Sequence, residues 1–167
     1  MTTLQRRSFE AGHHRKFLVI ADESREVESA VIFAASRIQR SGGQIKMLYV
    51  VEPDAQFWGG VRQVQVEEET NKAKALFRLF RRKLVNEGFY AVVVEEVIVE
   101  GKRDEMINAE IDQDQDIAIL VLGAAADAKG PGPLIASLVA GPTAGKFPIP
   151  ITIVPGNLSI EAIKSLA

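Results

Sequence analysis

Five stretches of the sequence are short runs in which nearly every residue is apolar. They cover residues 17–21, 45–51, 90–99, 117–122 and 149–154. Runs of this length without alternation are typical of strands that are buried on both faces, as in a parallel sheet. Pro150 lies within the last run and has no N–H to donate, so this strand is expected to start late or to lie at an edge.

Between these runs the apolar positions follow a helical period. The clearest case begins at Val27, where one apolar face recurs every three or four residues until Ser41-Gly42-Gly43 ends it. Further helices are predicted over residues 66–86, 103–112, 134–140 and 160–166, the last capped by Ser159. Residues 54–64, which precede the long second helix, are expected to form a loop, and Gly123 is expected to end the fourth strand.

Strands alternating with helices predict an α/β fold, a single-domain doubly wound parallel sheet with helices on both faces. The 167 residues suit one domain. We expect a flexible arm over residues 1–15, the α/β domain over residues 16–156 and a helical tail over residues 157–167. The charged faces of the long helix are interpreted as solvated, with a nucleic-acid patch as the alternative.

Composition excludes several classes of function. Twenty Lys and Arg against 22 Asp and Glu give a formal net charge of −2, which argues against a nucleic-acid-binding protein. The sequence has no cysteine, which removes thiolate chemistry and fits a reducing cytoplasm, where we expect the protein. Its two histidines, His13 and His14, both lie in the arm, so we predict neither a catalytic triad nor a metal site. No apolar run is long enough to span a membrane.

Ligands of open α/β sheets bind beyond the carboxyl ends of the strands, where the strand order reverses. The polar candidates there are Asp22, Glu52, Glu100 and the loop after Gly123. Asp22 is interpreted either as a turn or capping carboxylate or as a hydrogen-bond acceptor for a ligand. The Gly123 loop is interpreted either as a plain connection or as a cradle of backbone N–H groups for an anion.

Two familiar motifs are absent or incomplete. The segment 141–146 resembles a phosphate-binding loop, but it is one residue short and Phe147 follows its lysine in place of a hydroxyl residue. Asp112, Asp114 and Asp116 have the spacing of a calcium loop, but Ile117 and Gly123 stand where that loop needs glycine and glutamate. A polar helix end leading into a strand is the better interpretation of the three aspartates.

The residues resemble the universal stress protein family. The resemblance runs from about Lys16 to Gly156 and rests on residues 17–24 with the alanine-rich helix behind them, 47–51, 116–123 and 147–154. It implies a five-stranded parallel sheet of order 3-2-1-4-5, usually paired into homodimers, in a family that has ATP-binding and non-binding members. We expect the dimer to form through the strand that begins at Ile149 and ends at Val154.

The resemblance also implies a nucleotide site, with Asp22 meeting the adenine and Ala21 and Val50 around it. The family's glycine motif, G-x2-G-x9-G-[ST], falls on Gly123, Ala126, Ala136 and Ser137, so two of its three glycines are alanine here. Each alanine adds a Cβ where phosphates would approach the backbone, and Pro131 and Pro133 have no N–H to offer. Ser137 is interpreted as a phosphate contact or as a hydroxyl in the first turn of a helix. The expected contact residues are Ala21, Asp22, Val50, Leu122, Gly123, Ala126, Ser137 and Leu138.

The resemblance implies a regulatory or binding protein of the stress response that binds an adenine nucleotide, ATP or AMP with Mg²⁺, weakly. No catalytic residue is assigned. Alternatives are an ATP-binding protein with slow hydrolysis or phosphotransfer, and a dimeric adaptor with an empty crevice. A phospho-acceptor receiver domain fits less well, because Glu100 and Pro155-Gly156 stand where it needs an acceptor aspartate and a lysine.

Overall fold

The computed structural model describes residues 5–167, and its centre is a five-stranded, all-parallel sheet of order β3-β2-β1-β4-β5. This order confirms the prediction. The strands are β1 (Lys16–Ile20), β2 (Gln44–Val51), β3 (Val94–Glu100), β4 (Ile117–Ala124) and β5 (Ile151–Pro155). The helices are α1 (Val27–Ser41), α2 (Gly59–Asn86), α3 (Arg103–Gln113), α4 (Pro133–Leu138) and α5 (Ile160–Leu166), with a short 3-10 turn η1 (Ala144–Lys146).

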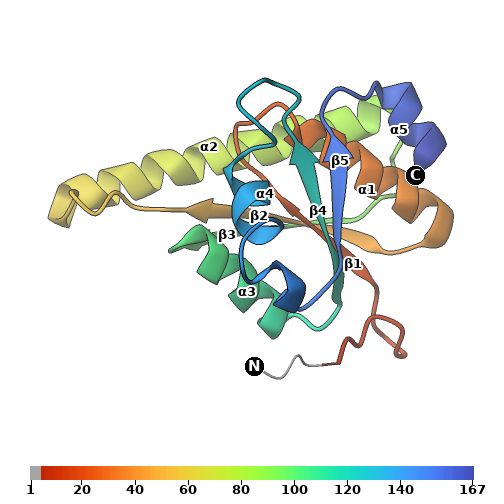
Figure 1. Cartoon of the computed structure of the whole chain (residues 1–167), viewed down its shortest axis with the longest axis horizontal. Helices are drawn as coiled ribbons and strands as arrows, with labels where there is room; N and C mark the ends of the chain where they lie inside the picture. Colours follow the sequence, from red (N-terminus) through yellow and green to blue (C-terminus); the bar gives the residue numbers. More distant parts are fainter. Residues whose placement is uncertain (1–4) are drawn as a thin grey trace.

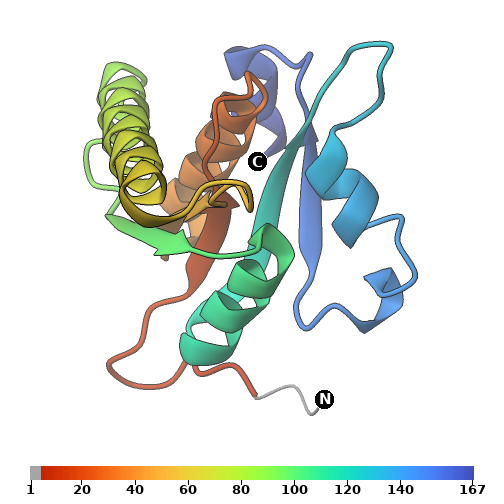
Figure 2. The same cartoon turned by 90° about the vertical axis from the view of Figure 1, so that its left-hand side faces the viewer.

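Helices cover both faces of the sheet, as Figure 2 shows with the strands between the two layers. Helices α1, α2 and α5 lie on one face, and α3 and α4 lie on the other. Because side chains alternate along a strand, β1 sends Phe17 and Val19 into the first core and Leu18 and Ile20 into the second. This division explains why the strands read as continuous apolar runs.

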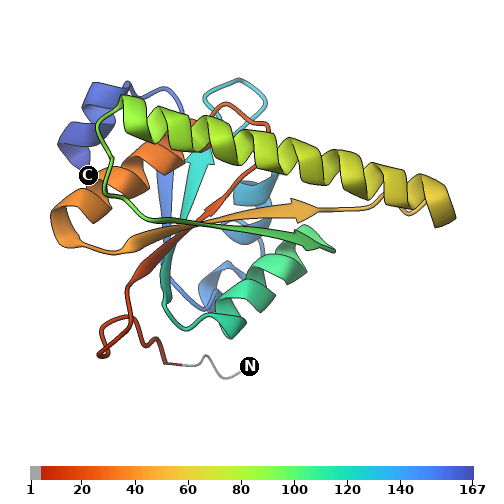
Figure 3. The same cartoon turned by 180° about the vertical axis from the view of Figure 1, so that it is seen from behind.

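Helix α2 differs from its prediction. The expected loop over residues 54–64 is wrong in its second half, because the helix begins at Gly59, seven residues before Val66. Its 28 residues span about 42 Å, and Figures 1 and 3 show its amino-terminal turns extending beyond the sheet. Val61 and Val64 are exposed there, so these turns have no core-facing apolar stripe from which they could be predicted.

Three strand boundaries became clear only from the structure. Strand β3 begins at Val94 rather than Tyr90, and Tyr90 itself is exposed. Strand β4 continues through Gly123 to Ala124, so Gly123 does not end it. Strand β5 begins at Ile151 and lies at the edge of the sheet, which confirms the reading of Pro150.

The two ends of the chain both pack on the domain. Residues 5–15, part of the predicted flexible arm, lie on the side of the sheet where β1 begins, with the Arg7 amide donating to the Gln115 carbonyl at 2.9 Å. Residues 1–4 of that arm lie outside the described residues. At the other end, Ser159 caps α5 as predicted, and Ile163 enters the core beside α1. Within residues 5–167, no helix combines the length and apolarity needed to cross a membrane.

Candidate functional site

A cleft of about 220 Å³ opens beyond the carboxyl ends of β1 and β4. This is the point where the strand order reverses. Strands β2 and β3 lie on one side of β1, whereas β4 and β5 lie on its other side. Apolar side chains form its walls, chiefly Ile20, Leu122 and Ile135. The polar side chains that line it are Asp22, Ser24, Glu26 and Arg103.

Asp22 holds a tight turn directly after β1. Its Oδ1 accepts hydrogen bonds from the Ser24 amide, at 2.8 Å, and from the Ser24 hydroxyl. Within residues 5–167, no hydrogen bond to Oδ2 is present. Asp22 therefore has the turn role that the sequence allowed, and its second oxygen remains available to a molecule in the cleft.

Gly123 and Gly156 make room for the start of α1. A Cβ added to Gly123 would lie 2.0 Å from the Glu26 carbonyl oxygen, and one added to Gly156 would lie 2.6 Å from the Ala124 carbonyl oxygen and 3.1 Å from the Glu26 Cβ. The first distance is far inside van der Waals contact, so no other residue fits at position 123 without moving the backbone. Gly123 thus serves helix packing, whether or not an anion binds nearby.

In the loop between β4 and α4, several backbone N–H groups already donate hydrogen bonds to other residues of the loop. The Ala125 amide donates to the Pro131 carbonyl, and the Lys129 amide donates to the Asp127 carboxylate. The Gly130 amide donates to the Asp127 carbonyl. Pro131 and Pro133 have no N–H at all. Five of the nine residues from 125 to 133 therefore offer no N–H to an anion.

Arg103 brings positive charge to the cleft from the first residue of α3. Its Nε lies 3.5 Å from the Glu52 carboxylate, at the end of β2. Asp22 and Glu26 line the same cleft. The charged lining is thus two carboxylates and one guanidinium that already has an acidic neighbour.

The structure brings only some of the predicted contact residues together. Asp22, Leu122 and Gly123 line the cleft. Ala21 and Val50 are buried in the cores beside it, with 2% and 7% of their surface exposed.

The remaining predicted residues lie elsewhere. Ala126 lines an adjoining hollow, together with Glu26. Ser137 and Leu138 line a separate groove against α3. The Ser137 hydroxyl donates to the Leu134 carbonyl within α4.

Glu26 and Arg103 are the charged lining residues that sequence reasoning missed. Arg103 comes three residues after Glu100, at the carboxyl end of β3, and that position is a usable signal. Glu26 comes two residues after Ser24, but its place over the Gly123 loop depends on how α1 packs and has no signature in the sequence.

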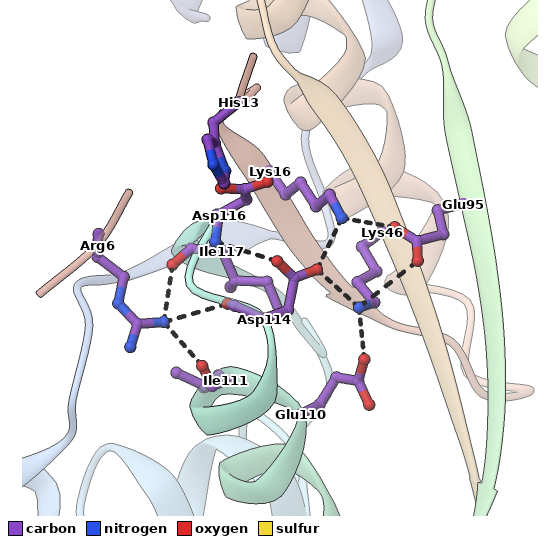
Figure 4. A network of polar contacts seen from close by, with 10 residues as sticks. All are labelled: Arg6, His13, Lys16, Lys46, Glu95, Glu110, Ile111, Asp114, Asp116 and Ile117. Carbon is purple, nitrogen blue, oxygen red and sulfur yellow. Dashed lines mark hydrogen bonds and ion pairs between the residues drawn. The ribbon is translucent and has the colours of Figure 1, made fainter. Parts of the chain in front are cut away.

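A second polar cluster lies at the opposite end of the sheet, where the strands begin (Figure 4). Asp114, just after α3, accepts hydrogen bonds from Lys16 at 2.7 Å and Lys46 at 2.8 Å. Glu110 lies 2.5 Å from Lys46, and Glu95 lies 2.9 Å from Lys16. The Lys46 side chain is only 5% exposed, so this is a largely buried ion-pair network that joins three strands to α3.

The arm closes over this network. The Arg6 guanidinium donates to the carbonyls of Ile111 and Asp114 at the end of α3 and of Ile117 at the start of β4, and His13 Nδ1 lies 2.7 Å from the Asp116 carboxylate. Asp114 and Asp116, which have calcium-loop spacing, are therefore engaged by cationic and imidazole side chains. Residues 5–167 contain no group of three or more side chains arranged to hold a metal ion.

The network holds its members in their charged forms. Burial alone would lower the pKa of Lys46, but hydrogen bonds to Asp114 and Glu110 outweigh it and raise that pKa above its usual value. Burial alone would raise the pKa of Asp114, but hydrogen bonds from Lys16 and Lys46 outweigh it and lower that pKa. The cluster therefore stabilises the fold only while Asp114 is ionised.

Comparison with known proteins adds two findings. The sequence model of the universal stress protein family matches residues 13–155. No curated protein sequence matches the chain.

Several solved structures share the fold. The universal stress protein UspA from Lactobacillus plantarum matches with a TM-score of 0.62 and 20% identity, over 84% of this chain and 97% of that one. An Arabidopsis thaliana universal stress protein family protein with AMP bound matches with a TM-score of 0.51 and 16% identity, over 84% and 91%. The Archaeoglobus fulgidus universal stress protein in complex with dAMP matches with a TM-score of 0.52 and 16% identity, over 84% and 98%.

Proposed function

We propose that this chain, which belongs to the universal stress protein family, binds an adenine nucleotide in the cleft beyond β1 and β4. The observation that carries the proposal is the pairing of Asp22 with apolar walls at the point where the strand order reverses. Parallel α/β sheets bind their ligands at this position, and ligand pockets combine apolar surface with a few placed polar groups.

Adenine suits the cleft chemically. Its flat ring can pack against Ile20, Leu122 and Ile135, while its amino group can donate to the free Oδ2 of Asp22. The carboxylate is fixed in place by Ser24, so the ligand need not order it on binding. The relatives crystallised with AMP and dAMP support the same class of ligand.

We further propose a regulatory role in the cytoplasm as a homodimer. Strand β5 lies at the edge of the sheet beside β4, and its Ile153 side chain is 40% exposed. An exposed strand edge with an apolar side chain is suited to pairing with a second copy. Turnover of ATP, if any, is expected to be slow, because we assign no general base in the cleft.

Calorimetric titration of AMP and adenosine into the purified protein tests the proposal, with Asp22→Asn as the informative variant. Asparagine keeps the Oδ1 that accepts from Ser24, so the turn survives, but it presents an NH₂ group to the ligand instead of an acceptor. We expect binding by the unaltered protein and at least a roughly tenfold loss in Asp22→Asn.

The matched control is Glu23→Gln, which removes the same charge one residue away, from an exposed side chain near Lys72. It should bind AMP like the unaltered protein. Failure of AMP and adenosine to bind at millimolar concentration would refute the proposal, as would equal binding by Asp22→Asn.

A further inference from the structure

Glu26 occupies the junction between the cleft and the loop that follows β4. Besides the cleft, it lines two adjoining hollows over that loop, of about 340 and 400 Å³. Its Oε1 lies 3.8 Å from the position that a Cβ on Gly132 would take. A ligand that extends from the cleft along the loop must therefore pass this carboxylate.

The loop does not compensate for that negative charge. Its backbone has few N–H groups to offer, since the amides of Ala125, Lys129 and Gly130 are bound within the loop and two positions are proline. It also carries a second carboxylate, Asp127, which lines the same two hollows as Glu26. Arg25 lines one of these hollows and Lys129 lines the other, so each hollow has one cation beside the two carboxylates.

The cleft itself is small. Its volume of about 220 Å³ lies below the roughly 300–1,000 Å³ usual for pockets that enclose drug-sized ligands. It suits the base and sugar of a nucleotide better than a base, a sugar and three phosphates. A single phosphate can lie beside the partly exposed Arg103, whereas a longer chain of phosphates that follows the loop passes Glu26.

We infer that the cleft selects adenosine and its monophosphate over ADP and ATP, and that Glu26 is the residue that sets this selectivity. The inference rests on the proposed function and narrows its ligand class. The physical cause is repulsion between the Glu26 carboxylate and the second and third phosphates, together with the shortage of N–H donors in the loop.

The test is a calorimetric series with adenosine, AMP, ADP and ATP on the full chain, without added Mg²⁺. Mg²⁺ is left out because a cation between Glu26 and the phosphates would mask their repulsion. We expect AMP to bind at least about tenfold more tightly than ATP, since two added phosphate charges each weaken binding several-fold. In Glu26→Gln, ATP affinity should rise about tenfold relative to adenosine affinity.

Glu28→Gln is the matched control, because it removes the same charge two residues along the chain, in the first turn of α1. Glu28 lies 3.1 Å from Lys83 and does not line the cleft. This variant should keep the preference for AMP. The melting temperature of each variant without ligand shows that it is folded.

The possible results separate this inference from the proposed function. Tight ATP binding by the unaltered protein would overturn the selectivity, although adenine binding would stand. An AMP preference that persists in Glu26→Gln, or is lost equally in Glu28→Gln, would overturn the role of Glu26. Binding of none of the four ligands to any variant would overturn the proposed function and this inference with it.

Discussion

The ion-pair network at the end of the sheet where the strands begin gives the most specific prediction about stability. In Asp114→Ala, Lys16 and Lys46 each lose a carboxylate at 2.7–2.8 Å in a site where Lys46 is 5% and Asp114 15% exposed. Removing one partner from a buried ion pair typically lowers the free energy of unfolding by about 3–5 kcal/mol. Because Glu95 and Glu110 still neighbour the two lysines, we expect about 3 kcal/mol, the low end of this range.

The control is an ion pair of the same length in the opposite environment. Arg62 and Glu100 also approach to 2.7 Å, but their side chains are 53% and 42% exposed. Glu100→Ala should therefore lower the free energy of unfolding by less than about 1 kcal/mol. Denaturant unfolding followed by far-UV circular dichroism measures both, since the single tryptophan, Trp58, is 84% exposed and a poor fluorescence reporter.

The loss in Asp114→Ala should also depend on pH in one direction. The pKa of Asp114 is lower in the folded protein than its ordinary value, so its contribution is complete above that ordinary value, near pH 4. The contribution disappears as the pH falls through the lowered folded pKa. The stability difference between Asp114→Ala and the unaltered protein should thus be constant from pH 5 to 7 and shrink below pH 4.

Two results would refute this account. A loss in Asp114→Ala no larger than that in Glu100→Ala would mean that burial does not strengthen the network. A stability difference that stays constant down to pH 2 would mean that the ionised carboxylate of Asp114 is not what stabilises the fold.

Further predictions concern packing, hydrogen bonding and assembly. Gly123→Ala should lower the free energy of unfolding by at least about 2 kcal/mol, because its Cβ would meet a backbone carbonyl of α1 at 2.0 Å, while Gly145→Ala, in open space, should be neutral in the same urea titration. Tyr49→Phe should lower the thermal midpoint by about 3 °C in calorimetry, since it removes a 2.7 Å hydrogen bond to the Glu69 carboxylate; an unchanged midpoint would contradict this. Ile153→Lys should convert the proposed dimer to monomer in sedimentation velocity, and an unchanged sedimentation profile of the folded variant would sink the β5 interface.

Much of the fold could be predicted because burial leaves a direct trace in the sequence. A strand covered by helices on both faces is apolar along its buried length, as β1 is from Phe17 to Ile20, and α1 repeats its apolar residues at the helical period. These apolar patterns are absent where a helix or strand extends beyond the core. The first turns of α2 project into solvent, and the run from Tyr90 to Val93 is apolar without belonging to β3, with Tyr90 and Val93 exposed.

The candidate site was less predictable because its key contacts join distant parts of the chain. Asp22 could be selected from its place at the end of β1. The position of Glu26 over the Gly123 loop depends on the close packing of α1 against β4 and β5, which no local pattern encodes. Lys46 gave no signal either, since a lone lysine in a buried strand identifies its partners only once β3 and α3 are in place.

The most direct test of the central claim is a ¹H–¹⁵N NMR titration of the labelled protein with AMP. If the cleft is the binding site, amide signals should shift at residues 20–27, at residues 122, 123, 132, 134 and 135, and at Arg103. Signals around Ser137 and Asn108, which line the separate groove against α3, should stay in place. Shifts confined to that groove, or no shifts at millimolar AMP, would contradict the account.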